Sequence, residues 1–279
     1  MGNITLPIIK FSKRDINRSL KIPETLSEKL AEDIGIHIGD GCMNVHKDSH
    51  RTNYQLVYSC SYHEELQYFN EFLRALKIEL YGIKPYASRL KNEFRLTIRS
   101  KTLVNFYSNV FNLPVGPKTT IDIPSIILSD KKFIISCLRG IMDTDFCLLF
   151  KKKENNNVHN YPVIMAGFRS EKLINSLSNI FNFLGISNFT CFRQTYIHPR
   201  RKFYPIYHIY ISGKKNLRKW WEMIGSSNTR LITRFEIYKK FGFYPPRINL
   251  QDRIKILNEE IDPLEFYKNI KRPGRDLNS

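Results

Sequence analysis

The order of secondary structure elements predicted from the sequence occurs twice, and this repeat constrains the fold more than any other feature. Each copy is predicted as helix, strand, strand, helix, strand, strand, helix from the spacing of its apolar residues. The first copy begins at Thr25, where Thr25 and Glu28 suit a capping box, and the first helix of the second copy begins near Phe133. We therefore expect an α+β protein with two similar halves related by a pseudo-twofold axis.

The predicted elements of the two copies match in order and in approximate length. In the first copy we expect helices at 25–40, 66–76 and 101–111, and strands at 42–46, 54–61, 83–89 and 93–99. In the second copy we expect helices at 133–145, 173–184 and 217–224, and strands at 148–152, 163–168, 189–196 and 207–212. The predicted organisation is a basic N-terminal arm (1–24), a first repeat (25–128), a second repeat (129–244) and a C-terminal helix and tail (245–279).

The predicted strands alternate between apolar and polar side chains, so each sheet has one face for a core and one for solvent or a ligand. Phe94 and Ile98 share one face of a strand, whereas Arg95 and Arg99 share the other, and residues 207–212 alternate similarly. An ordinary half-exposed sheet would show this alternation too. Two basic sheets in tandem, however, could span a duplex of roughly two helical turns.

The chain is strongly basic: 44 Lys and Arg residues oppose 26 Asp and Glu residues, giving a net charge of +18 and a pI near 9.7. A folded protein with this charge most often binds a polyanion, although a ribosome-associated or merely basic surface is the alternative. No apolar run is long enough to span a membrane, and no signal peptide is recognisable. Five cysteines without a CxxC pair indicate a reducing compartment, so we expect a cytoplasmic protein.

Two acidic residues occupy the same position at the end of the first helix in each copy. Asp40 follows Gly35 by five residues, and Asp145 follows Gly140 by five. Small residues on both helices would allow a close side-by-side approach, which would bring the two aspartates together. The predicted helix interface residues are Gly35, Gly39, Gly140 and Thr144.

A functional role explains two adjacent carboxylates better than a structural role does. Carboxylates a few ångströms apart repel each other unless divalent cations lie between them, and oxygen ligands suit Mg²⁺. Metal ions held in this way can activate water and stabilise the leaving oxygen in phosphodiester hydrolysis. The alternative is that each aspartate merely ends a helix, but a negative charge there opposes the helix dipole and here occurs twice.

The segments Asp33–Gly41 and Leu138–Phe146 resemble the LAGLIDADG motif of homing endonucleases. The chain is similar, over roughly Thr25 to Pro246, to the monomeric class with two motifs that archaeal and organellar introns and inteins encode. This resemblance implies a prokaryotic or organelle-encoded protein. Residues 224–242 are similar to the closing segment of archaeal members. Two motifs at this spacing, with the expected elements between them, make the resemblance specific.

The resemblance implies that the motif helices form the interface between the halves and that two saddle-shaped sheets enter the DNA major groove. It assigns divalent metal binding to Asp40 and Asp145, with the neighbouring Gly39 and Thr144, and expects two or three Mg²⁺ or Mn²⁺ ions. It implies a monomer that cuts double-stranded DNA at a long target and leaves short 3′ overhangs. The basic residue beside each phosphate would be Lys118 in the first half and Arg230 in the second.

The chain departs from the family pattern at several motif positions. The first motif opens with Asp33 and Ile34 and has Ile38 where many members carry a carboxylate. Phe146 replaces the usual final glycine of the second motif, and it could shift the backbone beside the metal. Because both metal-binding aspartates are retained, the family activity is still expected.

Positions on the predicted sheets, and a lysine run beside Asp145, suggest which residues contact DNA. The candidates are Tyr86, Arg89, Arg95, Arg99, Lys151, Lys153, Arg193, Tyr196, His208 and Tyr210.

Three alternative functions remain open at this stage. The fold could serve a maturase that binds intron RNA, or a non-catalytic DNA-binding regulator. A structural zinc site is the third, because potential ligands cluster in the sequence at Cys42, His46, His50, Cys60 and His63. Zinc is disfavoured since these residues lack paired CxxC turns and have no counterpart in the second copy.

Overall fold

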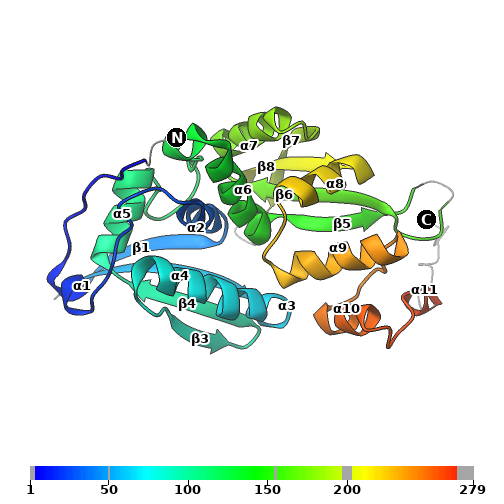
Figure 1. The fold of residues 1–279 in the computed structure, drawn as a ribbon, viewed down its shortest axis with the longest axis horizontal. Coiled ribbons are helices and arrows are strands. Elements are labelled where there is room, and N and C mark those ends of the chain that lie inside the picture. Colours follow the sequence, from blue (N-terminus) through cyan, green and yellow to red (C-terminus); the bar gives the residue numbers. More distant parts are fainter. Residues whose placement is uncertain (1–3, 50, 154–155, 197–202, 269–279) are drawn as a thin grey trace.

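Two four-stranded antiparallel sheets lie on either side of a central pair of helices, α2 and α6 (Figure 1). The computed structural model describes residues 4–49, 51–153, 156–196 and 203–268. The strand order is β1-β2-β4-β3 in the first sheet and β5-β6-β8-β7 in the second. Since the two orders correspond strand for strand, the predicted α+β fold with two similar halves is confirmed.

The first half contains the elements that the sequence predicts, with shifted boundaries. They are α2 (Glu28–Gly39), β1 (Gly41–Lys47), β2 (Thr52–Ser61), α3 (Tyr62–Gln67), a π-helical stretch (Tyr68–Leu73), α4 (Arg74–Tyr81), β3 (Tyr86–Leu90), β4 (Glu93–Arg99) and α5 (Lys101–Phe111). A short 3₁₀ helix, Ser125–Ser129, leads into the second half.

The second half repeats this order and adds helices at its end. It comprises α6 (Lys131–Asp145), β5 (Cys147–Lys151), β6 (Tyr161–Phe168), α7 (Glu171–Phe183), β7 (Asn188–Tyr196), β8 (Phe203–Ser212) and α8 (Lys214–Met223). The additional helices are α9 (Thr229–Phe241), α10 (Leu250–Leu257) and α11 (Glu265–Lys268). No helix among the described residues is long and apolar enough to cross a membrane.

The predicted start of the first helix was wrong by three residues. Ser27, rather than Thr25, is the N-cap of α2, and its hydroxyl accepts a hydrogen bond from the Leu30 amide at 3.2 Å. Thr25 instead forms an isolated antiparallel bridge with Thr5, which ties the beginning of the N-terminal arm to its end. The second helix of the repeat was predicted as one piece, but a π-helical stretch separates α3 from α4.

Helices α2 and α6 approach each other so closely that only glycine fits at two contact positions. A Cβ atom on Gly35 would overlap the Cys137 carbonyl, and one on Gly140 would overlap the Glu32 carbonyl. Both overlaps involve backbone atoms, which cannot move aside as a flexible side chain can. The two glycines therefore set how near the halves lie.

A buried ion pair compensates for the aspartate that opens the first motif. The Asp33 carboxylate and the Lys77 ammonium are both buried and lie 2.5 Å apart. Asp33 also accepts hydrogen bonds from the hydroxyls of Tyr81 and Tyr107, while Lys77 donates to Tyr58 at 2.6 Å. Because every member has a polar partner, the network is tolerated inside the first half.

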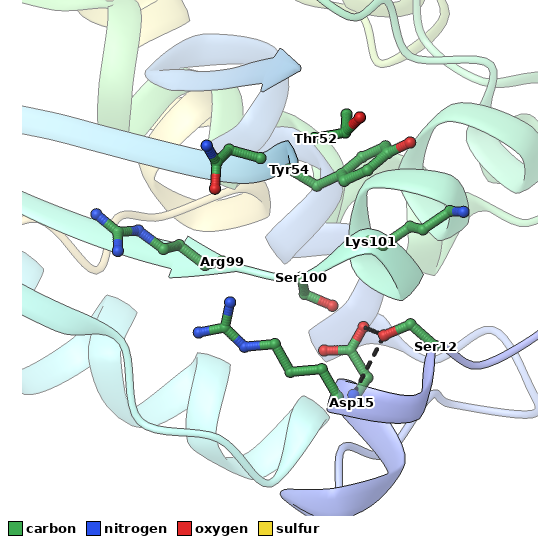
Figure 2. Close-up of a pocket in the computed structure, with 9 residues that line it drawn as sticks. Ser12, Asp15, Thr52, Tyr54, Arg99, Ser100 and Lys101 are labelled. Carbon is green, nitrogen blue, oxygen red and sulfur yellow. Dashed lines mark hydrogen bonds between the residues drawn. The ribbon is translucent and has the colours of Figure 1, made fainter. Parts of the chain in front are cut away.

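The N-terminal arm is docked on the first half through a second buried aspartate (Figure 2). Helix α1 (Lys13–Asn17) carries Asp15, which is 1% exposed and accepts hydrogen bonds from the Ser12 hydroxyl at 2.7 Å and the Thr102 amide at 3.0 Å. Arg18 pairs with the same carboxylate at 2.6 Å and also donates to the Arg99 carbonyl. These contacts attach α1 to the junction of β4 and α5.

We predict that Lys77→Met lowers the free energy of unfolding by about 3–5 kcal/mol, because Asp33 is left charged and buried without its cationic partner. The double variant Asp33→Asn/Lys77→Met removes both charges, so it should lose much less stability. Urea unfolding of the three proteins measures this. A loss below about 1 kcal/mol in the single variant would show that the ion pair matters little.

Candidate active site at the ends of the interface helices

Asp40 and Asp145 lie at neighbouring ends of the two interface helices. Asp40 directly follows α2, and Asp145 is the last residue of α6. A Cβ atom added to Gly39 would overlap the Thr144 side chain and would lie 3.4 Å from the Asp145 carboxylate. Both aspartates retain partial exposure, so the pair is accessible to a ligand.

Burial and mutual repulsion make ionisation of this pair unfavourable. Burial, and after it the Asp145 and Glu65 carboxylates, raises the pKa of Asp40 to about 8, against the opposing effect of Lys118 and Arg230. Burial also raises the pKa of Asp145 to about 6, with the same two cations opposing it. The site therefore favours an added positive charge.

The carboxylate oxygens fit a hard divalent cation such as Mg²⁺, which prefers oxygen ligands and keeps several waters. Within the described residues, no group of three or more His, Cys, Asp or Glu side chains is arranged to hold a metal. A cation here would take its remaining ligands from backbone carbonyls, water or a bound phosphate. The candidate zinc ligands form no such group at the four positions that the structure describes, Cys42, His46, Cys60 and His63. The fifth candidate, His50, lies outside the described residues.

Lys118 and Arg230 occupy equivalent places, each at the C-terminal end of its own motif helix. The Lys118 ammonium donates to the carbonyls of Ile38, at 2.9 Å, and Gly39. The Arg230 guanidinium donates to three backbone carbonyls, those of Asp143 (3.5 Å), Thr144 (3.4 Å) and Phe146 (3.3 Å). Cations here offset the negative end of each helix dipole. The carbonyls of Gly39 and Thr144, expected beside the metal, thus already accept hydrogen bonds.

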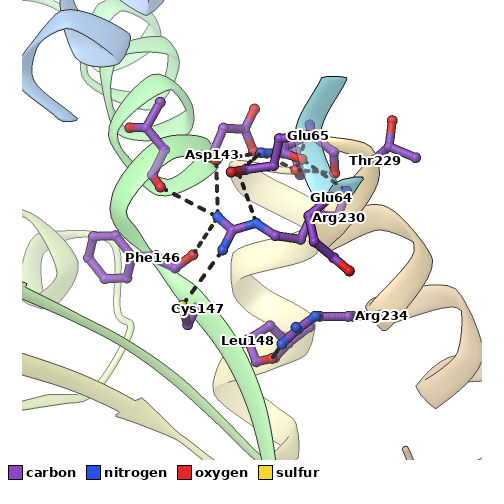
Figure 3. A network of polar contacts seen from close by, with 12 residues as sticks. Glu64, Glu65, Asp143, Phe146, Cys147, Leu148, Thr229, Arg230 and Arg234 are labelled. Atoms are coloured by element: carbon purple, nitrogen blue, oxygen red, sulfur yellow. Dashed lines mark hydrogen bonds and ion pairs between the residues drawn. The ribbon is translucent and has the colours of Figure 1, made fainter. Parts of the chain in front are cut away.

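Sequence reasoning missed three residues that organise the second half of the site (Figure 3). Asp143 is buried and accepts hydrogen bonds from the Ser226 hydroxyl and from the Ser227 amide at 2.8 Å. Asn228 caps α9 and donates both to the Asp143 carbonyl at 2.7 Å and to Glu65 at 3.0 Å. In the sequence, only the position of Asp143 within the second motif pointed to this group. Glu65 lies in the other half, 163 residues from Asn228, so no local pattern connects these two residues.

Phe146 is a core residue at the point where α6 turns into β5. Its ring is fully buried and contacts the rings of Phe168 and Phe181. Its amide still donates to the Met142 carbonyl at 3.3 Å, and its backbone is extended. The aromatic side chain points into the second half, and the carbonyl is turned to Arg230.

Strand register determines which of the predicted DNA contacts share the uncovered face of each sheet. In the first sheet, Tyr86 pairs with Thr97, which places Tyr86 on the face that carries Arg95 and Arg99. Arg89 pairs instead with the buried Phe94, so it lies on the opposite, helix-covered side, with its guanidinium 3.7 Å from the Tyr62 ring centre. Of the candidates in the first sheet, Arg89 therefore does not share the uncovered face with Tyr86, Arg95 and Arg99.

In the second sheet, four of the candidates share the uncovered face. They are Lys151, Arg193, His208 and Tyr210. Lys153 follows β5, is exposed, and places its ammonium over the Tyr161 ring. Tyr196 is the last residue of β7, and its side chain lies outside the described part of the structure.

Structural comparison finds the same architecture in proteins that bind DNA. The homing endonuclease I-DmoI in complex with DNA and Mn is 18% identical and has a TM-score of 0.50, over 72% of this chain and 97% of that chain. The chain has the LAGLIDADG homing endonuclease fold. I-SmaMI, bound to an uncleaved DNA target with calcium ions, is 13% identical with a TM-score of 0.50, over 87% of this chain and 97% of that chain. No family model matches the sequence, and no curated protein is similar to it.

We predict that the carboxylate pair lowers stability as pH rises when no divalent ion is present. Each folded-state pKa lies above the unfolded value of about 4, so ionisation between about pH 4 and 8 opposes folding. Asp40→Asn should therefore be about 2 kcal/mol more stable than the wild type at pH 8 in chelator, and equal to it near pH 4.

Chemical unfolding at both pH values tests this, with the exposed Asp48→Asn as the matched control. Added Mg²⁺ should stabilise the wild type more than Asp40→Asn at pH 8. A wild type as stable as Asp40→Asn at pH 8 in chelator would contradict the prediction.

Proposed function

We propose that this protein is a site-specific DNA endonuclease that depends on a divalent metal. The observation that carries the proposal is the position of Asp40 and Asp145, one from each half, at the adjacent ends of two interface helices. The uncovered faces of the two sheets flank this pair and carry basic and aromatic side chains. DNA-bound neighbours with the same fold support this reading.

In the proposed mechanism, Asp40 and Asp145 would hold the divalent metal at the adjacent ends of the two interface helices. The bound metal would supply the Lewis acidity that activates the attacking water and stabilises the leaving oxygen. Lys118 and Arg230 lie beside the two carboxylates, where each can add positive charge near one phosphate as charge develops. The expected product is a double-strand break with short 3′ overhangs, made by a monomer.

We propose that the two sheets bind the DNA major groove and that the docked N-terminal arm extends this surface. A concave pocket of about 190 Å³ lies at the end of the first sheet, beside α1 (Figure 2). Three cations line it, namely Arg14, Arg99 and Lys101, and none of them forms an ion pair within the described residues. Because Arg99 continues the uncovered face of β4, a duplex on that face would bring a backbone phosphate to this pocket.

We predict that purified protein with Mg²⁺ makes a sharp double-strand cut in host genomic DNA that lacks the encoding element. Sequencing of the fragment ends would locate the site and its overhangs. Asp40→Asn and Asp145→Asn should each abolish the cut, as should EDTA. If folded protein cuts nothing but binds host intron RNA tightly, the maturase function replaces this proposal.

We predict that Arg14→Ala and Lys101→Ala each reduce the salt dependence of DNA binding. Loss of one phosphate contact lowers the slope of log affinity against log salt by about 0.9. Fluorescence anisotropy on the mapped target, from low to moderate salt, measures the slope. Lys239→Ala, which removes an exposed lysine on α9, should leave it unchanged. Equal slopes in all variants would exclude the arm from the DNA interface.

A further inference from the structure

The two basic residues of the site differ in one respect: only Arg230 is paired with a carboxylate. The Arg230 guanidinium lies 3.1 Å from Glu65, which belongs to α3 of the other half. Lys118 forms no ion pair among the residues that the structure describes and donates only to backbone carbonyls. The cation of the second half is therefore ion-paired with Glu65, whereas the cation of the first half lies near Asp40 and Asp145 without a direct ion pair among the described residues.

This difference arises from a single position in the repeat. Helices α3 and α7 follow the N-caps Ser61 and Ser170 in the two halves. Counted from these caps, Glu65 corresponds to Ile174, which is buried and apolar. The second half thus offers Lys118 no matching carboxylate at that position.

The Glu65–Arg230 pair is held in place rather than loosely formed at the surface. The side chains of Glu65 and Arg230 are 12% and 14% exposed. Asn228, which is fully buried, donates to Glu65 at 3.0 Å and links it to the Asp143 carbonyl. Pairing in such a site restricts the guanidinium and cancels much of its charge.

We propose that Glu65 is a positioning residue that makes the two halves cut their DNA strands at unequal rates. It holds Arg230 against the end of α6 and offsets its charge, so the phosphate beside Arg230 receives less stabilisation as charge develops. The strand whose phosphate lies beside Lys118 is cut first, and nicked DNA accumulates. This inference rests on the proposed endonuclease function.

The test follows a supercoiled plasmid that carries the mapped target as it becomes nicked and then linear. Glu65→Gln keeps the hydrogen bond from Asn228 but removes the charge, and it should speed the second cut by about tenfold, equivalent to about 1.4 kcal/mol. Strand-specific labels on a short duplex should show that only one strand changes. Glu64→Gln is the matched control, because Glu64 pairs with Arg253 at 2.6 Å and lies outside the carboxylate site. It should leave the ratio of the two rates unchanged.

A double-mutant cycle tests whether the effect passes through Arg230. Glu65→Gln should have no effect on the ratio when it is combined with Arg230→Gln. If Glu65→Gln alone does not fold, Arg230→Gln is compared with the double variant: the ratio of the two rates should be the same in both, and a ratio that differs between them would contradict the inference.

Three results would overturn the inference. They are an unchanged ratio in folded Glu65→Gln, equal slowing of both strands, and the same effect of Glu65→Gln with and without Arg230. If the wild type makes no metal-dependent cut at all, the proposed function itself fails, which is a distinct outcome.

Discussion

The close packing of α2 against α6 is the constraint on which the rest of the structure depends. Gly35 and Gly140 leave no room for a side chain, so the backbones of the two helices are in contact. This contact sets the distance between the halves, and it places the ends of both helices at one point. The carboxylate pair and the placement of both sheets on either side follow from it (Figure 1).

The negative charges of Asp40 and Asp145 at the helix ends oppose this arrangement, and two nearby cations offset part of the repulsion. Two partly buried aspartates beside helix C-termini repel each other and the helix dipoles. Burial, together with the Asp145 and Glu65 charges, raises the pKa of Asp40 to about 8. Lys118 and Arg230 offset part of this charge by donating to the terminal carbonyls. The negative charge that remains favours the binding of a cation at this point.

Much of the fold was predictable because its signals are local in sequence. Apolar spacing located β4 at Glu93–Arg99 and α5 at Lys101–Phe111 without error. The start of α2 was missed because Thr25 and Ser27 are both residue types that cap helices. In the structure, Thr25 pairs with Thr5 in a β-bridge, and Ser27 caps the helix. Arg89 was among the expected DNA contacts because it lies on a predicted strand. Its register with the buried Phe94 places it on the helix-covered face of the first sheet.

The sequence by itself determined the repeat, the alternation of the strands and the paired aspartates, because each depends on spacing within a few turns or strands. Only the tertiary structure decided which residues complete the site. Glu65 and Asn228 are 163 residues apart, and no local pattern relates them. They meet because α3 of one half packs against the start of α9 of the other, and this contact makes two halves with the same element order unequal in charge.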